Sequence, residues 1–231
     1  LTYGARMRKF ALALLALAGC GDDDSRSSMS EGTSVTNQTG IVTMPGLTTM
    51  TESGASETGS GTVAAAGAVL LAATAADGAL NLGADVASTG GPVSLSAGAA
   101  ITLSALADVV TAGGSIDLLA GGTLTMADGS QARSGGGNLR AAATGDLTVG
   151  ELDASNSGAQ ATWGSVSIVS TAGRVLDSSG DAPGTLDVQA RNLRLLATAG
   201  GVGSAADALE TEVALVAGAV GSAGLSLTEA S

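Results

Sequence analysis

Apolar residues recur along the middle of the chain with a period of 23 residues. The Gly-Gly pairs at 90–91, 113–114 and 136–137 mark three successive copies of this repeat. In each copy, apolar residues stand two, four, six, ten and twelve positions after the second glycine. The residues in these columns are Val93, Leu95, Ala97, Ile101 and Leu103, then Ile116, Leu118, Ala120, Leu124 and Met126, and finally Leu139, Ala141, Ala143, Leu147 and Val149. Agreement of consecutive copies in every column indicates a structural repeat.

The spacing within each copy predicts short β-strands that bury one face. Apolar and polar residues alternate over 93–97 and 101–103, as in a strand with one face in a core. Gly98, Gly121 and Gly122 allow the chain to turn tightly between such strands. A copy of 23 residues is too short for a βαβ unit. We therefore expect an all-β fold, a parallel β-solenoid whose coils stack about 4.8 Å apart and align the apolar columns in its interior.

Looser copies extend the repeat in both directions. One copy precedes the regular ones, at positions 67 to 82, and another follows a four-residue insertion, at positions 164 to 170. These copies place the solenoid at residues 63–231, as about seven coils. The Ala-rich residues 63–76 form either the first coil or a capping helix. Residues 208–220 have apolar residues at both helical and alternating spacing, and the neighbouring copies favour a strand there.

The first twenty residues resemble a bacterial lipoprotein signal peptide. Basic residues at 6, 8 and 9 precede nine apolar residues at 10–18, a run too short to span a bilayer as a helix. Leu17-Ala18-Gly19-Cys20 then resembles a lipobox. The resemblance implies that residues 1–19 are a cleaved signal peptide and that Cys20 is lipidated, with several acyl chains that anchor the protein stably. Gly21 after the cysteine resembles the pattern for export to the outer membrane.

Residues 20–62 differ in composition from the repeat that follows. They are rich in Ser, Thr and Gly and carry few large apolar side chains. Such a segment cannot bury enough apolar area to offset the entropy lost on ordering. We expect a disordered linker between the lipidated Cys20 and the solenoid. The alternative is that this segment is an irregular edge of the solenoid itself.

The composition excludes several classes of function. The 231 residues carry a net charge of −12, no histidine and only 1% aromatic residues. A nucleic-acid-binding protein needs basic patches and often stacking aromatics, so we expect no nucleic-acid partner. Without histidine, the chain cannot form a His-based acid–base site or a His-ligated metal site. Its single cysteine excludes an intrachain disulfide.

Two aspartates are candidate ligands for calcium. Asp85 and Asp108 are 23 residues apart, and each stands six positions before the second glycine of its pair. A solenoid therefore stacks their carboxylates on adjacent coils. Two carboxylates at such a short distance either repel one another or share a cation such as Ca²⁺. No other cofactor is expected.

Catalysis on this fold would require grouped carboxylates. Parallel β-helices include polysaccharide lyases and hydrolases, which place Asp or Glu beside Lys, Arg or His. The pairs Glu151/Asp153 and Glu210/Glu212 have strand spacing. We expect them on solvated outer faces and assign no catalytic residue. Trp163, in the insertion between two copies, either contacts a sugar or protein ligand or covers the core beneath its loop.

Four stretches resemble the large β-helical surface proteins of filamentous-haemagglutinin type. They are residues 113–120, 145–150, 172–177 and 201–213. The resemblance covers about residues 85–231 and implies a right-handed parallel β-helix in an exported, adhesin-like protein. The chain differs from that family because it opens with a lipobox instead of a secretion domain. It also ends partway through a coil, which predicts truncation at its C-terminal end.

These features together predict a lipid-anchored protein of the bacterial outer membrane or cell surface. The linker would hold a non-catalytic solenoid off the membrane for adhesion or scaffolding. Its expected partners are the membrane, through the anchor, and glycans or proteins of a host or neighbouring cell. Two alternatives stay open at this point: a carbohydrate-active β-helix enzyme, and a passenger fragment of a longer repeat protein.

Overall fold

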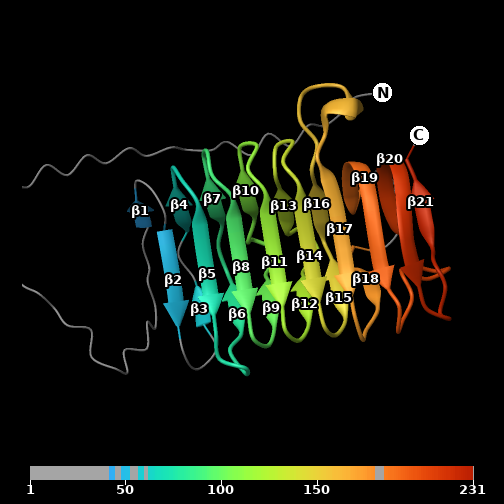
Figure 1. Ribbon diagram of the computed structural model, residues 1–231, viewed down its shortest axis with the longest axis horizontal. Helices are drawn as coiled ribbons and strands as arrows, with labels where there is room; N and C mark the ends of the chain where they lie inside the picture. Colours follow the sequence, from blue (N-terminus) through green and yellow to red (C-terminus); the bar gives the residue numbers. More distant parts are fainter. Residues whose placement is uncertain (1–41, 45–47, 53–56, 60–61, 180–184, 231) are drawn as a thin grey trace, which may run out of the picture. The chain divides into compact units, whose positions relative to one another are not determined.

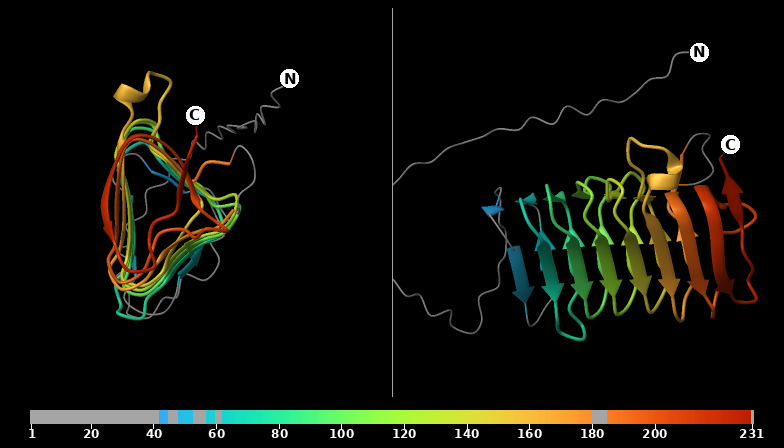
Figure 2. Two further views of the ribbon diagram at one scale, coloured as in Figure 1. Left: turned by 90° about the vertical axis from the view of Figure 1, so that its right-hand side faces the viewer. Right: turned by 45° about the horizontal axis from the view of Figure 1, so that its top comes forward.

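The computed structural model is a right-handed parallel β-solenoid (Figure 1). It describes residues 42–44, 48–52, 57–59, 62–179 and 185–230. The strands nearest the viewer in Figure 1 run downward, the chain returns upward behind them, and each coil lies to the right of the coil before it. This direction of winding is right-handed. Seen end-on, the coils have a narrow, roughly triangular outline (Figure 2).

Each regular coil contributes one strand to each of three faces. The first face holds β2 (Thr48–Glu52), β5 (Val69–Ala73), β8 (Val93–Ala97), β11 (Ile116–Ala120), β14 (Leu139–Ala143) and β17 (Ser165–Ser170). The second face holds β3 (Glu57–Gly59), β6 (Leu80–Leu82), β9 (Ile101–Leu103), β12 (Leu124–Met126), β15 (Leu147–Val149) and β18 (Val175–Asp177). The third face holds β1 (Val42–Met44), β4 (Val63–Ala65), β7 (Val86–Ser88), β10 (Val109–Thr111), β13 (Gln131–Arg133) and β16 (Glu151–Asp153).

Two long strands join the third face to the first near the C-terminal end. They are β19 (Val188–Ala197) and β20 (Leu209–Val220). The first part of β19 pairs with β16, and its second part pairs with β17. The first and third faces therefore form a single 15-stranded sheet, whereas the second face is a separate sheet of six strands. The last strand, β21 (Leu227–Glu229), pairs with β20.

The strand register confirms the 23-residue repeat. Ile116 lies opposite both Val93 and Leu139, and Leu124 lies opposite both Ile101 and Leu147. Every residue of the predicted columns is buried, with at most 8% of its surface exposed. Because the buried side chains of adjacent coils lie in contact, they form continuous apolar rows inside the solenoid.

The Gly-Gly pairs mark a corner at which successive coils approach closely. A Cβ atom on Gly114 would overlap the carbonyl oxygen of Gly91, and one on Gly137 would overlap that of Gly114. A hydroxyl three residues earlier supports the turn. The Oγ1 of Thr111 accepts a hydrogen bond from the N–H of Gly114 at 2.8 Å. Glycine therefore recurs at this corner because any side chain would collide with the preceding coil and force the coils apart.

The two ambiguous segments are both strands. Residues 63–76 contribute β4 and β5, and residues 208–220 contribute β20. Neither forms a helix: β5 completes the buried rows beside β8, and β20 pairs along β19, where Leu209 is buried while Leu215 and Val216 remain exposed. The only helix among residues 62–179 and 185–230 is one 3-10 turn, η1 (Gln160–Thr162), in the loop that projects from the coils in Figure 2. No helix in the described part of the chain is long and apolar enough to cross a membrane.

Strands also occur within the segment predicted to be a linker. The strands β1, β2 and β3 pair in parallel with β4, β5 and β6. Solenoid strands therefore begin before residue 63, and the described chain contains a coil that the Ser/Thr-rich composition concealed. Residues 1–41, which include the predicted signal peptide and Cys20, lie outside the described residues.

Candidate functional site

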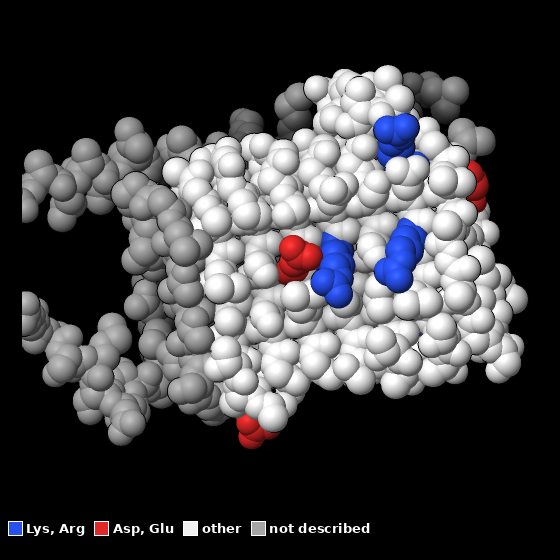
Figure 3. All heavy atoms as spheres, viewed as in Figure 1, with Lys and Arg blue, Asp and Glu red and all other residues white. Residues whose placement is uncertain are grey.

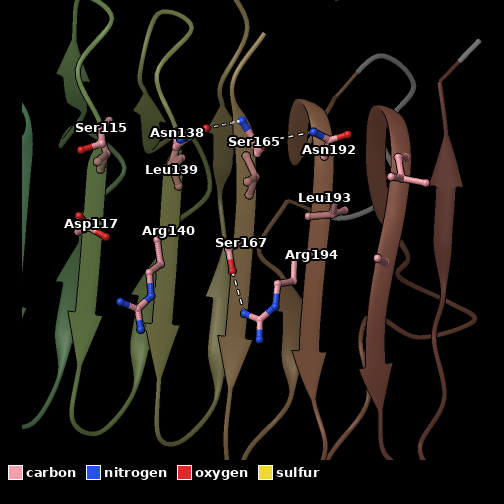
Figure 4. A pocket seen from close by; sticks show the side chains of 14 residues that line it. Ser115, Asp117, Asn138, Leu139, Arg140, Ser165, Ser167, Asn192, Leu193 and Arg194 are labelled. Carbon is pink, nitrogen blue, oxygen red and sulfur yellow. Dashed lines mark hydrogen bonds between the residues drawn. The ribbon is translucent and has the colours of Figure 1, made fainter. Parts of the chain in front are cut away.

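A shallow groove crosses the outer side of the first face. Because strand residues alternate in direction, every second side chain on this face points outward (Figure 4). One outward row contains Ser115, Asn138, Ser165 and Asn192, and a second contains Asp117, Arg140, Ser167 and Arg194. We call the hollow between these side chains the first-face groove. Its volume is about 510 Å³, and β11, β14, β17, β19 and β20 all contribute to its lining.

The small serines of β17 create the groove. Ser165 and Ser167 lie between the longer asparagine and arginine side chains of the coils on either side. Hydrogen bonds hold Asn138, Ser165 and Asn192 of the first of these rows in place. The Oδ1 of Asn138 accepts the N–H of Ser165 at 3.0 Å, and Asn192 donates its Nδ2 to the Oγ of Ser165 at 3.1 Å. The groove is therefore preformed by the register of the coils.

Two arginines give this groove a positive centre on an acidic protein. Arg140 and Arg194 are exposed and lie two coils apart, so their strands are separated by about 10 Å. Arg194 donates Nη1 to the Oγ of Ser167 at 3.2 Å. Neither guanidinium group belongs to a salt bridge within the described part of the chain. Figure 3 shows the two cations side by side, with one carboxylate next to them. Figure 4 labels Asp117 beside Arg140, with which it pairs on the adjacent strand.

Trp163 lies in the projecting loop, two residues before Ser165 of the groove. Its side chain is partly exposed, and its indole N–H donates to the carbonyl oxygen of Gly158 at 3.0 Å. The Oδ1 of Asn156 accepts the N–H of Gly158 at 2.7 Å. Trp163 therefore braces its own loop, and the bond uses the polar end of the ring.

The predicted calcium candidates Asp85 and Asp108 stack at the corner between the second and third faces. Asp85 accepts the N–H of Asp108 at 3.0 Å, and Asp108 accepts the N–H of Gln131 at 3.2 Å. Each aspartate therefore binds the backbone of the next coil. Neither belongs to a group of three carboxylates within the described coils.

The same corner carries a carboxylate cluster that sequence analysis missed. The position of Asp85 and Asp108 is occupied in later coils by Glu151, Asp187 and Glu210. Asp187 and Glu210 meet Asp177, which ends β18, and one carboxylate oxygen of each lies within 4.8 Å of the other two. We call these three residues the acidic corner. Two of them, Asp177 and Asp187, are buried, at 8% and 1% exposure.

The environment of the acidic corner disfavours ionisation. Burial raises the pKa of Asp187 to about 8, and the negative charge of Asp177 adds to the increase. The N–H of Glu210, which donates to Asp187 Oδ2 at 2.8 Å, opposes this rise. Burial also raises the pKa of Glu151, while Arg133 opposes it.

The pair Glu151/Asp153 does not lie on a freely solvated surface as expected. Arg133 contacts Asp153 at 3.0 Å and Glu151 at 3.4 Å. Asp153 also accepts the N–H of Ser155 at 2.7 Å and is only 4% exposed. Asp153 is therefore shielded from solvent by Arg133 and by the turn of the chain at Ser155.

One signal could have revealed the acidic corner. The dipeptide Asp-Val opens the third face at Asp85-Val86, Asp108-Val109 and Asp187-Val188. The third copy escaped the 23-residue alignment because Glu151 and Asp187 are 36 residues apart. Four of the extra residues belong to the loop that carries Trp163, and others belong to the connection between β18 and β19.

The acidic corner predicts a pH-dependent stability. The folded chain keeps a proton on Asp187 up to about pH 8, whereas the unfolded chain releases it near its ordinary value of 3.8. Folded molecules therefore bind more protons between these values, and the free energy of unfolding falls as the pH rises through them. Asp187→Asn, which does not titrate, should flatten this fall. Urea unfolding in a chelating buffer, followed from about pH 4 to about pH 8.5, measures it.

Asp85→Asn is the matched control for this prediction. It occupies the equivalent corner of an earlier coil and keeps the oxygen that accepts the backbone N–H. It should retain the pH dependence of the natural chain. If the free energy of unfolding falls equally with pH in the natural chain and in Asp187→Asn, Asp187 does not hold the proton.

Comparison with family models, with curated proteins and with solved structures found no match to this chain. The geometry of the first-face groove and of the acidic corner must therefore carry the functional argument.

Proposed function

We propose that this chain is a lipid-anchored bacterial surface protein whose solenoid binds an extended, acidic glycan without catalysis. The observation that carries this proposal is the pair of exposed guanidinium groups in the first-face groove. Arg140 and Arg194 project from alternate coils, with hydroxyl and amide groups between them. Guanidinium groups bind carboxylate and sulfate oxygens through paired hydrogen bonds, and serine and asparagine side chains bind hydroxyl groups.

The shape of the groove favours an extended polymer as its ligand. Adjacent coils repeat the same outward positions at about 4.8 Å intervals, so the groove runs across several strands. A polymer that carries acidic groups at intervals fits two cations about 10 Å apart. The protein itself has a net charge of −12, so it repels polyanions elsewhere and concentrates the attraction here.

The groove chemistry supports binding over cleavage. Glycoside hydrolases use two carboxyl groups that flank the scissile bond. Asp117 is the carboxylate among the residues that line this groove. Its neighbour in the same row is the exposed Arg140, and none of the other residues that line the groove is an Asp or Glu that could act as the second carboxyl group. A polysaccharide lyase or hydrolase therefore receives less support than a binding protein.

The position at the cell surface rests on the sequence. The lipobox-like Leu17-Ala18-Gly19-Cys20 supports a lipid anchor, and Gly21 supports export to the outer membrane. The rigid stack of coils supports a role as a presenting scaffold, since its outer rows keep a constant spacing.

Removal of both groove cations should weaken binding of acidic polymers. In Arg140→Gln with Arg194→Gln, the affinity for polygalacturonate or dextran sulfate should fall by about tenfold, because two charge-assisted contacts are lost. Isothermal titration calorimetry measures this affinity, with neutral dextran as the uncharged comparison. The affinity of the natural chain should also fall as salt is added.

The control for this experiment is Arg174→Gln. Arg174 is exposed but lies outside the groove, where it pairs with Asp146 at 4.0 Å. Arg174→Gln should bind the acidic polymers with the same affinity as the natural chain. An equal loss in Arg174→Gln, or an unchanged affinity in the double variant, would contradict the assignment of the groove.

Cys20→Ser tests the anchor separately. A serine cannot form the thioether to diacylglycerol, so the variant should leave the membrane fraction and enter the aqueous phase of a Triton X-114 extraction. Ser25→Ala, which leaves the lipobox-like segment intact, should partition with detergent like the natural chain. Continued detergent partitioning of Cys20→Ser would refute lipidation at this residue.

A further inference from the structure

We propose that the acidic corner, formed by Asp177, Asp187 and Glu210, binds one Ca²⁺ ion. This inference concerns a different part of the molecule from the first-face groove and does not rest on glycan binding. It also differs from the site expected at Asp85 and Asp108, which belong to no group of three carboxylates within the described residues.

Three separate elements bring the carboxylates together. Asp177 is the last residue of β18, Asp187 directly precedes β19, and Glu210 lies near the start of β20. Asp187 and Glu210 occupy the same position on adjacent coils, so the sheet register holds them side by side. Asp177 approaches from the second face across the corner. This arrangement places three negatively ionisable groups within 4.8 Å of one another.

Asp177 carries a buried oxygen that the protein does not satisfy. Its Oδ1 accepts hydrogen bonds from the N–H of Ser179 at 2.8 Å and from the Oγ of Ser179 at 3.0 Å. Its Oδ2 is buried and has no hydrogen-bond partner within the described structure. The hydroxyl oxygen of the adjacent Ser178 is also buried without a hydrogen-bond partner in the described structure. Buried polar oxygens of this kind are rare because they cost free energy, and a bound cation satisfies them.

Solvent can reach this corner through a polar hollow. The hollow has a volume of about 290 Å³, and Ser178 and Asp187 form part of its wall. Glu151 and Asp128 line the same hollow. An ion therefore has a route to Asp187, with room in the hollow for the water molecules that complete its coordination shell.

The donor set selects a hard cation. All the groups at the corner present oxygen, and the chain has no histidine. Ca²⁺ takes six to eight oxygens at about 2.3–2.6 Å, so two ligands on opposite sides of one ion lie about 5 Å apart. Oxygens within 4.8 Å of one another fit this sphere. Mg²⁺ requires a tighter octahedron and retains its own waters, so it suits this corner less well.

The contrast with the earlier coils explains why the site occurs once among the described coils. At Asp85 and Asp108, the chain passes from the second face to the third without bringing a third carboxylate to the corner. At Asp187, by contrast, Asp177 at the end of β18 has a carboxylate oxygen within 4.8 Å of those of the stacked Asp187 and Glu210. Asp187 still accepts the N–H of Glu210, as Asp85 accepts that of Asp108, and the third carboxylate is what makes this corner suited to a cation.

Calcium should stabilise the folded chain. With a dissociation constant of about 10⁻⁴ M, as in many extracellular modules, about 10 mM Ca²⁺ should raise the Tm by about 5–10 °C over the same protein in EDTA. Mg²⁺ at equal ionic strength should raise it much less. Isothermal titration calorimetry should give one Ca²⁺ per chain.

Asp177→Asn should abolish this response, because it removes the charge of the unsatisfied carboxylate while preserving its shape. Asp85→Asn, at an equivalent corner whose aspartate binds backbone, should respond as the natural chain does. If Asp177→Asn fails to fold, calorimetry on Glu210→Gln decides the question by the loss or retention of the binding heat. The absence of a calcium-specific Tm shift in the natural chain, or an undiminished shift in Asp177→Asn, would overturn the proposal, whatever the groove binds.

Discussion

The stacking of each coil on the equivalent residues of the coil before it is the constraint on which the whole structure depends. The backbone hydrogen bonds of a parallel stack require in-register strands, and in this narrow coil the register decides which side chains face the interior. Ile116 lies between Val93 and Leu139, and all three are almost fully buried. A slip of one residue would bring Asp117 into the core and expose Leu118. The scarcity of aromatic residues follows from the same narrowness.

This constraint confines variation to the outer rows and the corners. Extra residues occur where the chain has left a sheet, in the loop that carries Trp163 and in the connection between β18 and β19. The first-face groove uses outward positions of regular strands, and the acidic corner uses an insertion. The two features therefore arise in different ways from one scaffold. Each adds polar chemistry without changing the buried rows.

The parts of the structure that sequence analysis could predict are those controlled by the buried rows. Leu118 and Leu124 recur with their equivalents at a fixed period, so the strands and their register followed directly. The groove could not be predicted in the same way. Asp117, Arg140 and Ser167 share no residue type, and only the register places them in one row. The acidic corner was hidden because its insertion breaks the period, and β2 was hidden by the Ser/Thr-rich composition around it.

The most direct test of the stacked register is cross-linking of outward positions on the first face. In a Cys20→Ser background, Leu119→Cys with Ala142→Cys places two thiols opposite each other on adjacent coils, about 4.8 Å apart along the stack. Mild oxidation, followed by mass spectrometry of the digested chain, should show an intrachain disulfide in this variant. Leu119→Cys with Val169→Cys separates the thiols by two coils, about 10 Å, which is too far to bridge. A disulfide in the second pair and none in the first would contradict the stacking of coils on which the groove and the acidic corner both depend.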